Sequence, residues 1–180
     1  AWGYEAVSHG GWAAVGTANG FRGRLLPTTG ASAEFQMVVD EVGMMLTDLS
    51  LHGDVAVKVG NADDIVAARQ QGRMGFLPTV EHLSIGNQIH RVDVLYGVGV
   101  RLAGLTYSWR TYIGDGCYER TDSGLSEFGS EVVRRMNDLG MAVDLSHAGH
   151  QTAMDAIEHS RAPVIFSHNA ANALRPTKRT

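Results

Sequence analysis

The chain has 180 residues, of which 44% are hydrophobic and 19% charged, a composition typical of a globular domain with one sizeable core. A net charge of -4 provides no basic field for nucleic acid, so no nucleic-acid partner is expected. No stretch reaches the roughly 20 consecutive apolar residues of a membrane span, and with no signal peptide visible the compartment stays open. The single cysteine, Cys117, excludes an internal disulfide and a thiolate-rich zinc site, so histidine and carboxylate would have to hold any metal.

Hydrophobic spacing and capping residues divide the first half of the chain into alternating strands and helices. The first 30 residues are rich in glycine and the hardest to assign. The elements expected in this half are, in order, a strand at 12–17, a helix at 31–51, a strand at 55–59, a helix at 61–71 and a strand at 74–80.

The second half continues the alternation, with a long loop in its middle. Its expected elements are a helix at 86–96, a strand at 100–107, a loop at 108–124, a helix at 126–139, a strand at 141–146, a helix at 151–160, a strand at 162–167 and the start of another helix at 170–174. About five strands that alternate with helices predict an α/β fold with a mostly parallel sheet. Periodicity does not decide whether that sheet is open or belongs to a barrel.

Two of the expected strands end in the same dipeptide, Ser146-His147 and Ser167-His168, with one crossover helix between them. The strands should therefore lie side by side and parallel, with both imidazoles at their carboxyl ends, where α/β proteins build active sites. Glu81 follows the strand at 74–80 and adds a carboxylate, although His82 competes for the same inward direction.

Glu81, His147 and His168 therefore form a candidate zinc site, because neutral imidazole and carboxylate are the ligands that zinc accepts without thiolates. The alternative is that each histidine is a hydrogen-bonded residue at the rim of the core. Asp144 precedes the first Ser-His pair, and we expect it to support the site or the fold rather than to bind metal.

Three runs closely resemble the membrane (renal) dipeptidase family of zinc peptidases. They are Gly-Leu-Ser-Glu-Phe-Gly at 124–129, Val-Val-Arg-Arg-Met-Asn-Asp-Leu-Gly-Met-Ala-Val-Asp-Leu-Ser-His at 132–147, and Ser-Arg-Ala-Pro-Val-Ile-Phe-Ser-His at 160–168. The resemblance extends upstream through 97–107, more loosely to 61–73, and is vague before that.

The resemblance implies a (β/α)8 barrel of which about five of the eight units are present, and two zinc ions per active site. It implies that Glu81 bridges the two ions, that His147 and His168 complete the ligands of the second, and that Arg179 binds the substrate carboxylate. Tyr107 stands where the family has a substrate-contacting histidine. The implied reaction is hydrolysis of a dipeptide, or a similar small amide, by a metal-bridged hydroxide.

Two family features have no counterpart in the sequence. His9 is followed by Gly10 and Gly11 rather than by the His-x-Asp pair that holds the first zinc, and the family's late catalytic aspartate would lie beyond Thr180. We therefore interpret residues 1–180 as a single domain from the middle of a metallo-dependent hydrolase barrel.

Two expectations follow from that interpretation, and two alternative functions stay open beside it. As an isolated fragment, the chain is expected to be inactive. The alternatives to a zinc dipeptidase are a catalytically incomplete remnant that binds at most one zinc and an amidohydrolase that acts on lactams. The open sheet edges predict aggregation or pairing with another copy, such as a homodimer.

Overall fold

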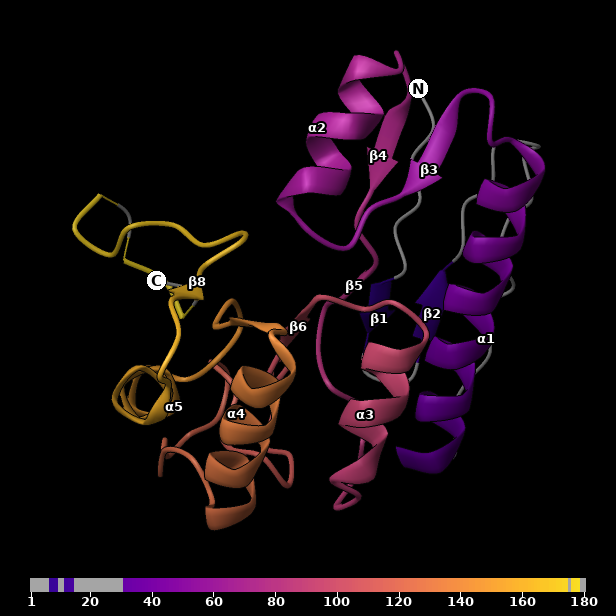
Figure 1. Cartoon of the computed structure of the whole chain (residues 1–180). Coiled ribbons are helices and arrows are strands. Elements are labelled where there is room, and N and C mark those ends of the chain that lie inside the picture. Colours follow the sequence, from indigo (N-terminus) through magenta and orange to yellow (C-terminus); the bar gives the residue numbers. More distant parts are fainter. Residues whose placement is uncertain (1–6, 10–11, 15–30, 175, 179–180) are drawn as a thin grey trace.

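The computed structural model describes residues 7–9, 12–14, 31–174 and 176–178 (Figure 1). Its strands are β1 (Val7–His9), β2 (Trp12–Ala14), β3 (Ala56–Lys58), β4 (Met74–Phe76), β5 (Thr79–Val80), β6 (Leu102–Gly104), β7 (Ala142–Asp144) and β8 (Val164–Ile165). Its helices are α1 (Ala31–Leu51), α2 (Ala62–Gln70), α3 (His90–Gly97), α4 (Glu127–Leu139) and α5 (His150–His159). The expected α/β alternation is confirmed.

A four-stranded parallel sheet in the order β5-β6-β7-β8 carries the candidate site. Its register aligns Val80 with Ala103, Gly104 with Asp144, and Asp144 with Ile165. Because the strands are parallel and nearly in step, the chain leaves each of them at the same edge of the sheet. The segments that carry Glu81, His147 and His168 therefore meet at that edge.

Helices α3, α4 and α5 lie in a row along the sheet, with α4 between the other two (Figure 1). The core between helices and sheet is made of Val, Leu, Ala and Met side chains: Val80, Ala103, Leu105, Val143 and Leu145 from the strands and their ends, and Val92, Leu95, Val132, Val133 and Met136 from the helices. Burial of each Val, Leu or Met contributes about 1.5–3 kcal/mol, which fixes the helices against the sheet.

Local capping explains where two of the helices begin and where one of them ends. The Asn61 side chain accepts a hydrogen bond from the Asp64 amide at 2.9 Å and starts α2, and Ser126 does the same for Gly129 at the start of α4. Gly140 ends α4 in a left-handed conformation with φ of 73°, which glycine adopts without a steric penalty.

Several expected boundaries were wrong. The strand expected at 74–80 is two strands: β4 pairs with β3 and β5 with β6, and Pro78 lies between them. The helix expected at 86–96 begins only at His90. Of the strand expected at 12–17, the described part forms β2, paired antiparallel with β1, and 15–17 lie outside the described residues. The helix expected at 170–174 is absent from the described residues, which form only a turn there. No helix in the described part of the chain is long and apolar enough to cross a membrane.

Candidate metal centre

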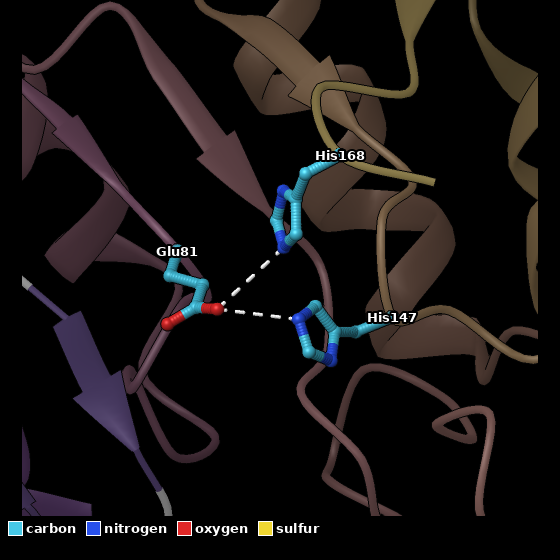
Figure 2. Close-up of side chains that lie close together, drawn as sticks. All are labelled: Glu81, His147 and His168. Carbon is cyan, nitrogen blue, oxygen red and sulfur yellow. Dashed lines mark ion pairs between the residues drawn. The ribbon is translucent and has the colours of Figure 1, made fainter. Parts of the chain in front are cut away.

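Glu81, His147 and His168 come together at the edge of the sheet, and both imidazoles turn a nitrogen toward the same carboxylate (Figure 2). His147 Nε2 lies 3.2 Å and His168 Nε2 3.6 Å from Glu81 Oε1. One potential ligand atom from each residue lies within 4.8 Å of the other two. The three positions that the sequence singled out for a metal thus form one cluster.

Two of the three spacings in this cluster are compatible with ligands of one metal ion. In a tetrahedral zinc site with bonds of about 2.0 Å, neighbouring ligand atoms lie about 3.3 Å apart. The two nitrogen-to-oxygen distances, 3.2 and 3.6 Å, bracket that value. A separation of 3.6 Å is too long for a hydrogen bond, so a direct bond between His168 and Glu81 does not account for the arrangement.

His147 is held by its backbone and by ring stacking. It is the one non-glycine residue in the described ranges with positive φ, at 71°, and it is 3% exposed. Its carbonyl accepts a hydrogen bond from the Cys117 amide at 2.8 Å. The Tyr107 ring stacks on its imidazole with centroids 4.3 Å apart. A left-handed backbone is costly for a histidine, and such strain is concentrated at functional positions.

His168 is held by polar contacts. Its amide donates to Ser146 Oγ at 3.0 Å, and its Nδ1 lies 2.7 Å from Ser167 Oγ. The Ser167 hydroxyl donates to the buried Asp144 carboxylate, which also accepts from the Ser146 and Ser167 amides at 2.9 and 3.1 Å. Burial raises the pKa of Asp144, but these hydrogen bonds outweigh it and hold that pKa below its usual value.

Glu81 is placed by the close approach of two strands. A Cβ at Gly104 would lie 2.0 Å from the carbonyl oxygen of Glu81, so only glycine allows the chain after β5 to pass this near to β6. The Leu83 amide then donates to the Gly104 carbonyl at 2.8 Å. The position of the Glu81 carboxylate is therefore set by a backbone contact between neighbouring strands.

The long loop between β6 and α4 is fastened to the start of α5. Buried Asp115 binds the Arg110 guanidinium, which holds the pKa of that carboxyl below its usual value. Asp122 accepts hydrogen bonds from the Gly124 amide at 3.1 Å and the Gln151 amide at 2.6 Å. The loop thereby supplies a cap that α5 lacks and fixes the segment that carries His147.

A cavity of about 680 Å³ lies beside His147, between this loop and α5. Its walls are both polar and apolar, and include Cys117, Glu119, His150, Met154, Phe166 and Lys178. A space of this size is in the range that small-molecule ligands occupy.

Other residues singled out in the sequence have varied positions. Tyr107 lies against the cluster through its stacking on His147. The His82 ring contacts Tyr107, at 5.4 Å between centroids, and its Nε2 lies 3.2 Å from Ser84 Oγ. His82 is therefore not a member of the cluster. Arg179 lies outside the described residues. Ser146 and Ser167 were not predicted as functional residues, although their repetition before each histidine was the available signal.

The chain is similar to proteins of a known family. The membrane dipeptidase family, peptidase family M19, matches residues 28–180. A dipeptidase of Claviceps purpurea, tcpJ, is 31% identical over 147 residues, which cover 80% of this chain and 35% of the relative. The chain therefore spans about a third of the length of this curated relative.

Two solved structures share the arrangement of strands and helices. An amidohydrolase from Pseudomonas aeruginosa is 34% identical, with a TM-score of 0.77, over 81% of this chain and 45% of that one. A metallopeptidase from Rhodobacter sphaeroides, liganded with a phosphinate mimic of the dipeptide L-Ala-D-Ala, has a TM-score of 0.77 over 87% of this chain and 46% of that one. At 22% identity, this second likeness supports the fold alone. Since the family matches most of its length, the chain belongs to the membrane dipeptidase family of metallopeptidases.

Proposed function

We propose that the chain carries one half of the dinuclear zinc centre of a dipeptidase, with Glu81, His147 and His168 as the metal ligands. The convergence of the two Nε2 atoms on one oxygen of Glu81 is the observation that carries the proposal. Two neutral nitrogens and one carboxylate oxygen leave a tetrahedral zinc one open position, as catalytic zinc sites require. The resemblance to the family assigns Glu81 the bridging position, in which its second carboxylate oxygen would bind another ion.

Bound zinc would supply a Lewis acid and a water molecule acidified to near neutral pH. The residues of the chain orient the substrate around it. Tyr107, stacked on His147, would donate a hydrogen bond from its phenol to the substrate. Arg179 would pair its planar guanidinium with the terminal carboxylate of a dipeptide, for which its fork of donors is suited. The cavity beside His147 has room for such a ligand.

Family membership and the bound dipeptide mimic of the Rhodobacter sphaeroides relative support dipeptides as the substrate class. The likeness to the Pseudomonas aeruginosa amidohydrolase favours a second candidate, hydrolysis of another small amide such as a lactam. Both use the same metal centre. Release of amine from a panel of dipeptides and lactams distinguishes them.

We also propose that the parallel strands are about five of the eight of a (β/α)8 barrel, with residues 1–180 in one domain. The matched solved chains, of which this chain covers close to half, support this proposal. In such a barrel, the active site lies at the carboxyl ends of the strands, which is where Glu81, His147 and His168 are.

Glu81→Gln tests the metal centre directly. The amide keeps the shape but loses the charge, so we expect zinc affinity to fall by more than the roughly 10- to 100-fold that removal of a supporting partner costs. Zinc content after dialysis and chelator competition measure this. Glu158→Gln, an exposed change on α5, is the matched control and should bind zinc like the wild type. Retention of full zinc content by Glu81→Gln would refute the assignment.

A further inference from the structure

The polar contacts around His168 allow one assignment of their protons. The Asp144 carboxylate accepts two amide protons on Oδ1, from Ser146 and Ser167, and one hydroxyl proton on Oδ2. A carboxylate can only accept hydrogen bonds, so the Ser167 hydroxyl donates its single proton to Asp144. Its lone pairs then face Ser146 Oγ at 3.3 Å and His168 Nδ1 at 2.7 Å. At that distance Nδ1 must donate.

We propose that Asp144 and Ser167 form a relay that holds the proton of the neutral His168 ring on Nδ1. The lone pair is then on Nε2, the nitrogen that faces Glu81 across 3.6 Å. Only a nitrogen without a proton can bind a metal ion, so the relay selects the tautomer that the centre needs. Asp144 and Ser167 are thus positioning residues. The purpose assigned to the relay rests on the proposed function, but the proton position does not.

The relay also explains the repeated Ser-His pair. Both serines serve His168: Ser167 accepts from the ring, and Ser146 accepts from the backbone amide at 3.0 Å. His147 has a different kind of support, from its left-handed backbone and the stacked Tyr107 ring. Asp144 accepts hydrogen bonds from the amides of both serines, so one buried carboxylate positions both of the serines that contact His168.

Asp144→Asn reverses the direction of the hydrogen bonds in the relay with little change in the shape of the side chain. The Asn carbonyl takes the two backbone amides, so its NH2 group faces Ser167 and donates to it. The Ser167 proton is then directed at His168 Nδ1, and the ring proton moves to Nε2. We expect nitrogen NMR of 15N-histidine protein, metal-free and at a pH where the ring is neutral, to show Nδ1–H in the wild type and Nε2–H in Asp144→Asn. Zinc affinity should fall by about 10- to 100-fold.

A second pair of variants decides the matter if Asp144→Asn does not fold. Ser167→Ala removes the acceptor and should weaken zinc binding by about 10-fold or more, whereas Ser167→Thr keeps the hydroxyl and should restore it. Ser50→Ala removes an exposed hydroxyl that bonds only within α1, and should change neither readout. The relay is overturned if Ser167→Ala loses zinc binding and Ser167→Thr does not restore it. It is also overturned if the wild-type His168 ring has its proton on Nε2.

The two readouts separate this inference from the proposed function. Absence of zinc binding by the wild type would refute the metal centre, while the nitrogen spectrum of metal-free protein would still confirm or overturn the relay. Zinc binding by a protein whose metal-free form has the ring proton on Nε2 would support the metal centre and overturn the relay.

Discussion

At the scale of single residues, the three candidate ligands are held by three different means. Glu81 is placed by a strand that passes close to Gly104, His147 by a left-handed backbone, and His168 by a hydrogen-bonded serine. The three side chains also contact one another, through the His147 and His168 rings, whose centroids lie 4.9 Å apart, and through the pairing of both imidazoles with Glu81. Because each side chain is held by its surroundings, metal binding has less of the site to order and loses less conformational entropy.

The left-handed conformation of His147 predicts a conflict between stability and metal binding. Both His147→Gly and His147→Ala remove the imidazole and its stacking on Tyr107, so both should lose zinc. Glycine accepts a φ of 71° without a steric penalty, whereas alanine does not. We expect His147→Gly to exceed His147→Ala by about 1 kcal/mol in free energy of unfolding.

Urea unfolding of metal-free protein at a fixed protein concentration measures that difference. The two variants differ by a single methyl group, so each is the control of the other. Equal stabilities, or a more stable alanine variant, would show that the backbone at this position is not strained.

Most of the cluster could be predicted from the sequence because parallel strands end at one edge. A buried apolar run followed by Ser-His places a histidine near that edge whatever the details of packing. The choice between Glu81 and His82 could not be made, because it depends on where β5 ends and how closely β6 approaches it. Asp144 was expected to support the site or the fold, but its partner Ser167 was missed for the same reason, since the two are 23 residues apart and meet only after β7 and β8 pair.

At the scale of elements, the contact between β5 and β6 controls the position of Glu81. Gly104→Ala would place a methyl group 2.0 Å from the Glu81 carbonyl oxygen, and backbone must move to relieve it. Overpacking of this kind costs about 1–3 kcal/mol. We expect Gly104→Ala to lower the free energy of unfolding by that amount and to weaken zinc binding. Chemical denaturation and chelator competition measure the two effects.

Gly43→Ala is the matched control for that substitution. Gly43 lies in the middle of α1 with no atom within 4 Å of an added Cβ, so alanine should stabilise the helix by about 0.5–1 kcal/mol and leave zinc binding unchanged. Wild-type zinc affinity in Gly104→Ala would show that the strand approach does not position Glu81.

Boundaries that depend on local capping chemistry were among those predicted correctly. Asn61, Ser126 and Gly140 cap helices through their own side chains or backbone, and these boundaries were confirmed. The helix expected at 170–174 failed because helix-forming composition does not suffice for a short segment without packing. Leu174 is 87% exposed and has no such packing. The division of 74–80 into β4 and β5 depends on partners far along the chain, β3 and β6.

At the scale of the whole molecule, the sheet has an open edge beside an apolar surface. Strand β8 pairs with β7 on one side only among the described residues. Near it, Met154 and Ile157 on α5 and Phe166 after β8, which also line the cavity beside His147, are 41%, 43% and 50% exposed. Exposed apolar side chains next to an unpaired strand are the usual place for association with another chain.

We therefore expect the 180-residue chain to self-associate through the surface formed by β8 and α5. Light scattering coupled to size-exclusion chromatography should give a dimer or a larger species at micromolar concentration.

Ile157→Lys places a charge in that surface and should shift the chain toward monomer, because burial of an unpaired charge costs more than the apolar contact contributes. Val94→Lys changes a residue of similar exposure, 39%, on α3, which α4 separates from α5, and should leave association through the surface of β8 and α5 unchanged. A wild-type chain that elutes as a monomer, or a Val94→Lys variant that dissociates as readily as Ile157→Lys, would show that this surface is not where copies meet.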